Sequence, residues 1–131
     1  MFSIFFEPTT PANPLLLLLL TLVTLITVYL LIVVAEASVY QWMGWGNLRA
    51  CIKTAAQVNT LTFLVGVALM LIFPKPALWH LLVFLLVAVT VEALWLTRIR
   101  PDRPRANWTV SIVANAVSYM VLILPPFLAQ R

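Results

Sequence analysis

The sequence of 131 residues contains few of the residue types from which catalytic and metal sites are built. It has one cysteine, Cys51, and one histidine, His80. A single cysteine excludes an internal disulfide bond and a metal site made of several thiolates. The 3 glycines form no phosphate-binding loop, and no two acids lie close together in the sequence. The sequence therefore predicts a protein that is not an enzyme and has no metal site.

Charged residues are scarce as well. Only 9% of the chain is charged, whereas 63% is hydrophobic and the mean hydropathy is +1.05. A typical soluble domain has about 25% charged and about 45–50% apolar residues. A water-soluble fold of this length cannot bury so much apolar surface, so the composition predicts an integral membrane protein. The net charge of +4 does not indicate nucleic-acid binding, because the basic residues lie between the apolar segments.

Long apolar runs are what the sequence has in abundance. Four of them, 14–40, 50–73, 77–97 and 106–128, reach the length of about 20 residues that crosses a bilayer. We expect helices to start near Pro14, Pro76 and Pro104, and Pro125 to kink or end the last helix. The expected fold class is all-α, a polytopic membrane protein with four transmembrane helices. An N-terminal interfacial segment, 1–13, which has no Lys or Arg and does not resemble a signal peptide, precedes two helical hairpins, 14–73 and 74–131.

The distribution of Lys and Arg predicts the orientation. Six basic residues flank the first and third connections: Arg49, Lys53, Arg98, Arg100, Arg103 and Arg105. Only Lys75 and Arg131 lie on the other side. Because basic residues stay in the cytoplasm, loops 41–53 and 98–107 are expected there, with both termini periplasmic or lumenal. The expected location is a bacterial inner membrane or a thylakoid membrane.

The two halves of the chain share scarce polar residues at a constant offset. Four pairs match when the sequence is shifted by 56 positions: Glu36 with Glu92, Arg49 with Arg105, Asn59 with Asn115, and Thr62 with Ser118. Each half contains two apolar runs, so both copies have the same direction in the membrane. The offset therefore predicts a tandem, parallel repeat of a helical hairpin.

The matched residues also predict contacts inside each hairpin. Helical side chains lean toward the N-terminus of their helix, so Glu36 and Asn59, on antiparallel helices, converge, as do Glu92 and Asn115. An unpaired acid in the bilayer costs about 2.5–3.5 kcal/mol, so each acid needs a partner. We expect structural polar pairs formed by six residues: Glu36, Asn59, Thr62, Glu92, Asn115 and Ser118. Arg49 and Arg105 are expected to assist at the cytoplasmic rim.

One helix face predicts close packing. Ala55, Asn59, Thr62 and Gly66 recur at helical spacing and form a stripe of small and polar residues. Such stripes are typical of membrane helices that approach each other closely.

Other interpretations of these residues stay open. Glu36, Glu92, Asn59 and Asn115 are also the residues that a proton or cation path would use. His80 is a candidate ligand for a chlorophyll, haem or metal, or simply an interfacial polar residue. The glycosylation motif at Asn107 falls on the predicted cytoplasmic side and is discounted.

The segment EASVYQWMGWGNLRACIKTAAQVNTLTFLVGV, residues 36–67, resembles the filament-integrity proteins of cyanobacterial septal junctions. The shared features are Glu-Ala at a helix end and Val-Asn in the next span. The resemblance covers only the first hairpin. It implies a non-catalytic component of a cell–cell junction.

The sequence thus favours a small structural or accessory subunit of a respiratory, photosynthetic or cell-junction complex. Its expected partners are the lipid bilayer and other membrane subunits met through helix faces, and a homo-oligomer is compatible. A small homo-oligomeric channel or transporter using Glu36 and Glu92 is one alternative, and a pigment- or quinone-binding subunit is another. No cofactor is predicted, although bound lipid, chlorophyll, carotenoid or quinone would suit the aromatic-rich composition.

Overall fold

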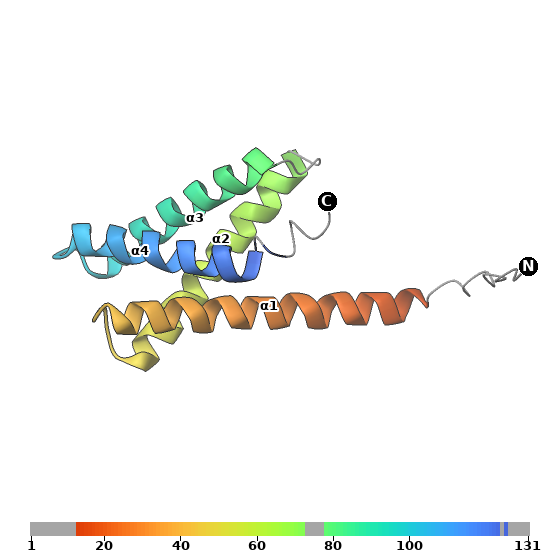
Figure 1. Ribbon diagram of the computed structural model, residues 1–131, viewed down its shortest axis with the longest axis horizontal. Helices are drawn as coiled ribbons and strands as arrows, with labels where there is room; N and C mark the ends of the chain where they lie inside the picture. The colour runs from red at the N-terminus through yellow and green to blue at the C-terminus, as the bar shows by residue number, and fades with distance from the viewer. Residues whose placement is uncertain (1–12, 73–77, 124, 126–131) are drawn as a thin grey trace, which may run out of the picture.

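The computed structural model describes residues 13–72, 78–123 and 125, and all of its regular structure in this part of the chain is helical. Four α-helices follow one another, α1 (Pro14–Trp42), α2 (Leu48–Ile72), α3 (Leu78–Ile99) and α4 (Pro104–Ser118) (Figure 1). A π-helical segment, η1 (Tyr119–Ile123), continues α4. The predicted all-α class is confirmed.

Three of the helices, α1, α2 and α3, are long and apolar enough to cross a membrane. The fourth is shorter than the sequence predicted: α4 has 15 residues and is therefore about 22 Å long, less than the hydrocarbon thickness of about 30 Å. It ends at Ser118, where the π-helical turns begin, a few residues before Pro125. Proline lacks an N–H and crowds the carbonyl of the preceding turn, which accounts for the widened helix there. The rest of the predicted fourth span, from residue 126, lies outside the described residues.

Two helix starts follow the predicted proline rule. Pro14 and Pro104 lie in the first turns of α1 and α4, where the missing N–H has no partner to lose. At α1 the Asn13 side chain also accepts from Leu15 N at 3.0 Å. The third expected start, Pro76, lies outside the described residues.

The end of α1 is closed by a glycine turn. Gly44 has φ +70°, the left-handed region that favours glycine. Gly44 N donates to Gln41 O at 3.0 Å, and Trp45 N donates to Tyr40 O at 2.9 Å, which together form a Schellman motif. The turn folds the Trp45 ring back onto Tyr40, with 5.7 Å between ring centroids. Asn47 then caps α2, its Oδ1 accepting from Ala50 N at 2.9 Å.

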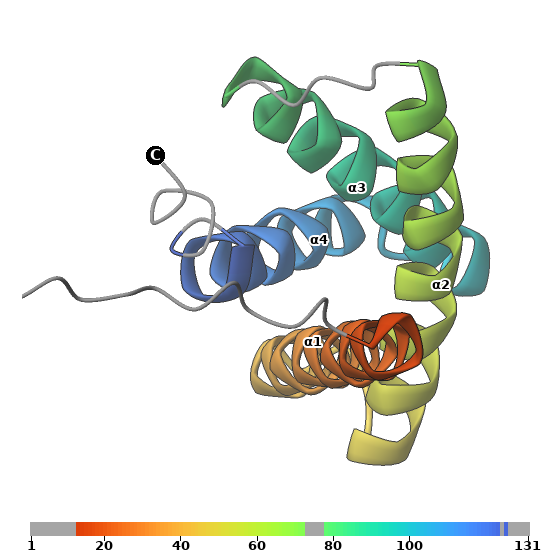
Figure 2. The same ribbon diagram turned by 90° about the vertical axis from the view of Figure 1, so that its right-hand side faces the viewer.

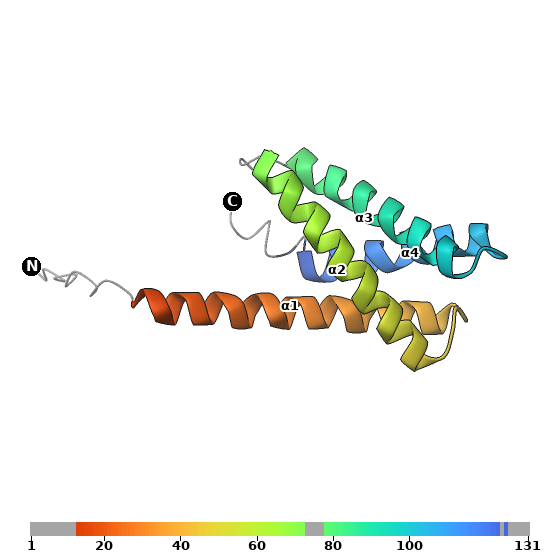
Figure 3. The same cartoon turned by 180° about the vertical axis from the view of Figure 1, so that it is seen from behind.

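The helices pack in the cyclic order α1, α2, α3, α4 and back to α1 (Figure 2). The C-terminal part of α1 lies beside α4, whereas α2 crosses α1 obliquely and moves away from it toward its own C-terminal end (Figure 3). The N-terminal half of α1 extends beyond the other helices. Its leucine, isoleucine and valine residues between 15 and 26 are each 47–71% exposed. The four helices are therefore packed at one end and separated at the other.

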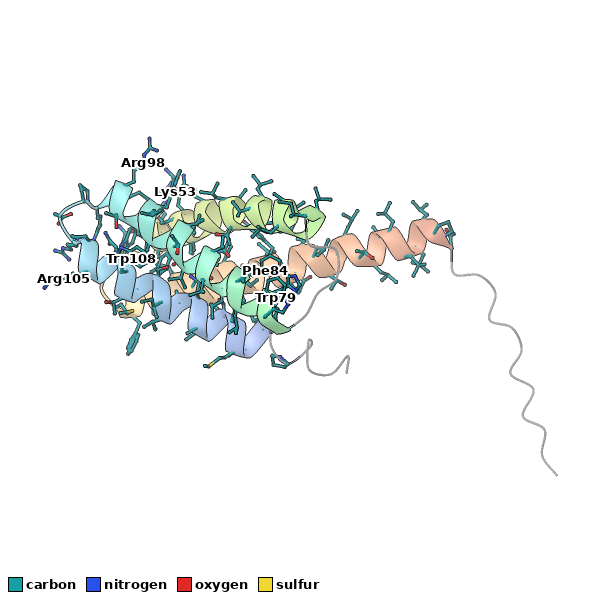
Figure 4. The ribbon with its side chains drawn as sticks, turned by 90° about the horizontal axis from the view of Figure 1, so that it is seen from above. Lys53, Trp79, Phe84, Arg98, Arg105 and Trp108 are labelled. Atoms are coloured by element: carbon teal, nitrogen blue, oxygen red, sulfur yellow. The ribbon has the colours of Figure 1, made fainter. Side chains whose placement is uncertain are left out.

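Polarity is distributed as expected for a bilayer. The most exposed helix faces carry Leu, Ile and Val, while buried positions include acids, amides and hydroxyls. Lys53, Arg98 and Arg105 lie at the packed end, and Trp79 lies toward the other (Figure 4). The apolar surface and the basic end together are typical of a helical membrane protein.

Candidate functional site

Six polar side chains from all four helices meet inside the bundle. This polar cluster consists of Glu36 and Tyr40 from α1, Asn59 from α2, Glu92 from α3, and Asn115 and Ser118 from α4. Both acids are 1–2% exposed. In this setting each polar atom depends on partners within the protein.

The first predicted pair joins α1 and α2. Asn59 Nδ2 donates to Glu36 Oε2 at 2.5 Å and also to Ala55 O at 2.9 Å. The bond to the carbonyl four residues earlier holds the amide against its own helix, so that its nitrogen points at the acid. The structure therefore contains the contact expected from side-chain direction.

The second predicted pair repeats this geometry between α3 and α4. Asn115 Nδ2 donates to Glu92 Oε2 and to Ser111 O, the latter at 3.1 Å. Ser111 in turn donates its hydroxyl to Val89 O at 2.8 Å. The second hairpin thus contains the same acid–amide contact at the same sequence spacing as the first.

Two further bonds connect the hairpins. Ser118 Oγ donates to Glu36 Oε1 at 3.2 Å, and the Tyr40 hydroxyl donates to Glu92 Oε1. Tyr40 lies one helical turn from Glu36, and Ser118 lies one turn from Asn115. The two carboxyl groups therefore lie close together, and each of their four oxygens accepts a hydrogen bond from within the bundle.

Sequence reasoning missed Tyr40. At the repeat offset Tyr40 aligns with the apolar residue Leu96, so the comparison of the two halves does not single it out. In the structure Tyr40 is fully buried, with 0% exposure. Its position four residues after Glu36, on the same face of α1, is the one feature that could have identified it.

Thr62 does not form the predicted polar pair. Its counterpart Ser118 reaches Glu36 across the bundle, but among the described residues nothing accepts a hydrogen bond from Thr62. The matching position at Glu92 is taken by the Tyr40 hydroxyl. Thr62 is half-buried and lines a cavity instead.

The predicted assistance from Arg49 and Arg105 is also wrong. Both side chains are exposed, and within the described residues the ion pair found is Asp102–Arg103 at 3.4 Å. Arg49 lies ten residues before Asn59, so it is about 15 Å from the level of the cluster along α2. Each guanidinium stays in the polar region at the end of its helix.

A second polar network lies at the packed end. Trp45 Nε1 donates to Asn107 Oδ1 at 3.0 Å, and Asn107 Nδ2 donates to Arg100 O at 2.8 Å. The Arg100 guanidinium lies 4.8 Å from the centroid of the Trp45 ring, a cation–π contact. Asn107 is fully buried, so the glycosylation motif has no accessible acceptor amide.

A cavity of about 560 Å³ lies on the other side of the polar cluster, where the helices separate. Its walls are mostly apolar, and the cluster residues Glu36, Asn59, Asn115 and Ser118 lie at one end. Close helix packing was expected at Gly66, but a Cβ there would meet nothing within 4 Å. Gly66 belongs to the C-terminal half of α2, and the C-terminal end of α2 lies away from α1 because the two helices cross obliquely (Figure 3).

His80 lines the cavity far from the cluster. It is 7% exposed and stacks on Trp79, with 3.6 Å between ring centroids. Phe84, another lining residue, is on the same part of α3 (Figure 4). The described residues contain no group of three or more histidine, cysteine or acidic side chains that could hold a metal ion.

The geometry thus combines a hydrogen-bond network in which all four carboxyl oxygens accept a bond with an adjoining, mostly apolar cavity. Comparison of the chain with protein-family models, with curated proteins and with solved structures finds no match.

Proposed function

We propose that the chain is a small, non-catalytic structural or accessory subunit of a larger membrane assembly. The observation that carries this proposal is the N-terminal half of α1, which extends beyond the bundle with its apolar side chains exposed. Thr21, Thr24 and Thr27 lie on one broad side of it, and small hydroxyl residues are common where membrane helices pack. A partner helix seated on this half of α1 would complete the packing that the chain itself leaves open.

The polar cluster supports a structural role. Each carboxyl oxygen of Glu36 and Glu92 accepts a hydrogen bond from an internal donor. A carboxyl group that conducts ions needs an oxygen atom that can release one partner and bind another. The oxygen atoms of Glu36 and Glu92 instead accept hydrogen bonds that hold four helices together. The loops at the packed end are short, 43–47 and 100–103, so partners are met mainly through helix faces and lipid.

We further propose that the chain is built from two tandem hairpins, 14–73 and 74–131, with four membrane crossings and a segment 1–13 at the interface. The matching Glu36–Asn59 and Glu92–Asn115 bonds support the repeat. Basic residues at the packed end support cytoplasmic loops in a bacterial inner or thylakoid membrane. Labelling of Asp102→Cys by an impermeant reagent, expected from the cytoplasmic side alone, tests the orientation.

Among possible host assemblies, cell junctions are favoured by the resemblance of residues 36–67 to filament-integrity proteins. Respiratory and photosynthetic complexes fit the same apolar, loop-poor form. A homo-oligomeric channel or transporter is the second candidate function, because the cavity extends from the separated end of the bundle to Glu36.

Photo-crosslinking tests the docking surface. A benzophenone amino acid at Leu19 should give adducts with another membrane protein, because a partner helix is proposed to pack against this part of α1. The matched control is Leu94 on α3, which is 58% exposed against 56% for Leu19 and should give lipid adducts only. Adducts of Leu19 with lipid alone would show that α1 has no partner, and adducts with a second copy of the chain would favour the homo-oligomer.

A further inference from the structure

The cavity between the four helices has the form of a small-molecule site. Its volume of about 560 Å³ lies within the range of about 300–1,000 Å³ found for such sites. Aliphatic and aromatic side chains make the walls, among them Ile32, Phe63 and Phe84. The cluster residues Glu36, Asn59, Asn115 and Ser118 lie at one end, and His80 lines the wall far from them. The cavity is thus mostly apolar, with carboxyl, amide and hydroxyl groups at its inner end.

Thr62 lines the cavity near that inner end and differs from most of the described threonines. Six described threonines donate to the carbonyl four residues earlier: Thr21, Thr24, Thr27, Thr60, Thr90 and Thr109. This bond is the usual way to satisfy a hydroxyl in a membrane helix. Within the described residues Thr54, Thr62 and Thr97 make no such bond, and of these three only Thr62 lines this cavity. Its hydroxyl therefore has a free hydrogen-bonding capacity beside the cavity.

The neighbouring amides supply the complementary groups. Asn59 and Asn115 use their nitrogens on the two acids, and within the described residues no donor reaches their Oδ1 oxygens. Both residues line the cavity. The polar end of a molecule bound here would meet the Thr62 hydroxyl and two amide oxygens. It would accept a hydrogen bond from the hydroxyl and donate one to an amide oxygen.

These features select the chemistry of the occupant. A plain hydrocarbon tail would fill the walls but leave the hydroxyl and amides without partners, which costs free energy in a medium without water. Among the described residues, no Lys or Arg lines the cavity to match an anionic head. The acids at its inner end already accept from internal donors, which disfavours a cationic head. An uncharged oxygen head group on an apolar body fits both parts.

We propose that this cavity binds an uncharged lipophile, with its hydroxyl or carbonyl head at Thr62 and its apolar body between α1, α2 and α3. The site does not depend on docking by α1, because its lining residues belong to this chain alone. A chain that does not bind the lipophile would still dock through α1, and a chain that does not dock would still bind the lipophile.

Four probes of equal chain length test the head-group requirement. The full chain in phosphatidylcholine nanodiscs is titrated with radiolabelled oleyl alcohol, which should bind at a saturable site that empty nanodiscs lack. Unlabelled cis-9-octadecene, oleate and oleylamine are then used as competitors. Each should displace the alcohol at least about 5-fold less effectively than unlabelled alcohol does: octadecene because it loses one hydrogen bond, and oleate and oleylamine because a buried charge without a counter-charge is costly.

Two variants locate the site. Thr62→Val keeps the side-chain shape and should weaken alcohol binding by about 5-fold without changing octadecene competition. Gly66→Phe should abolish saturable binding, because its ring enters space in which a Cβ meets nothing within 4 Å. Ala68→Phe, two residues along α2 on an exposed position, is the matched control and should bind as wild type does.

The results separate clearly. Equal competition by octadecene and oleyl alcohol would overturn the role of the polar end, and tighter binding of oleate or oleylamine would overturn the uncharged head group. Saturable binding that survives in folded Gly66→Phe, or is absent from the wild type, would overturn the site. If Gly66→Phe does not fold, Thr62→Val decides alone: unchanged alcohol affinity contradicts the proposal.

Discussion

At the scale of single residues, the two buried acids depend on individual donors. Glu92 is held by the Tyr40 hydroxyl and the Asn115 amide, and Glu36 by Ser118 and Asn59. No water in the bilayer core replaces a donor that is removed. The strength of the bundle therefore rests on a few hydroxyl and amide groups rather than on apolar burial alone.

Removing the hydroxyl of Tyr40 should destabilise the protein strongly. Tyr40→Phe leaves Glu92 Oε1 without its donor, and a buried unsatisfied group of this kind costs about 1–3 kcal/mol. The free energy of unfolding is measured by circular dichroism during titration with sodium dodecyl sulfate in mixed micelles.

Tyr29→Phe is the matched control. The Tyr29 hydroxyl donates to Ala56 O at 2.9 Å, a carbonyl that also accepts from the Thr60 hydroxyl. Its loss should cost less than about 1 kcal/mol. Equal losses for the two variants would show that the Tyr40–Glu92 bond contributes little.

At the scale of elements, two glycines illustrate how helix geometry decides the effect of one methyl group. Gly44 ends α1 in the left-handed region, whereas Gly66 lies within α2 beside the cavity. Glycine is required at position 44 by the left-handed backbone conformation, whereas the backbone conformation at position 66 does not require it. The same substitution should therefore have opposite effects at the two positions.

Gly44→Ala should lower the free energy of unfolding by about 1–2 kcal/mol, because an L-residue is strained at φ +70°. Gly66→Ala should leave it unchanged or raise it by up to about 1 kcal/mol, because alanine favours helix and its Cβ meets no neighbour. Both are compared with wild type in the same detergent unfolding assay. A loss at Gly66 as large as that at Gly44 would contradict the open space beside α2.

Elements also show what the sequence can predict. Pro14 and Pro104 located two helix starts, because proline in a first turn acts through the local backbone alone. The Glu36–Asn59 contact was predictable because a short loop fixes the two helices antiparallel. Gly66 was misjudged because the crossing angle of α2 depends on the whole bundle. The contact of Tyr40 with Glu92 likewise depends on packing between hairpins.

At the scale of the whole molecule, one hydrogen-bond network joins four helices at the packed end and leaves them separated beyond it. The network explains how a chain with few charged residues keeps two acids inside a bilayer. It also allows the proposed structural role to be tested against transport. A structural acid needs a hydrogen-bonding side chain, whereas a transporting acid must bind a proton or an ion.

Glu36→Gln and Glu92→Gln should therefore keep the fold, because an amide can still pair with asparagine and a hydroxyl. Glu36→Leu and Glu92→Leu should each lower the free energy of unfolding by about 1–3 kcal/mol. In liposomes, wild-type proton and cation flux should equal that of protein-free vesicles. Clear wild-type flux that disappears in folded Gln variants would instead establish the channel or transporter.

The unequal lengths of α1 and α4 have a consequence for the surrounding lipid. With 29 residues, α1 is about 43 Å long, whereas α4 and the π-helical segment that continues it together have 20 residues, 104–123, and are at most about 30 Å long. Lipids beside the two therefore meet helices of different length, and the bilayer must thicken beside α1 or α1 must tilt. Such mismatch is relieved when neighbouring proteins place surfaces of equal height together. A partner with a long apolar helix beside α1 would thus lower the free energy of the surrounding bilayer as well as that of the contact itself.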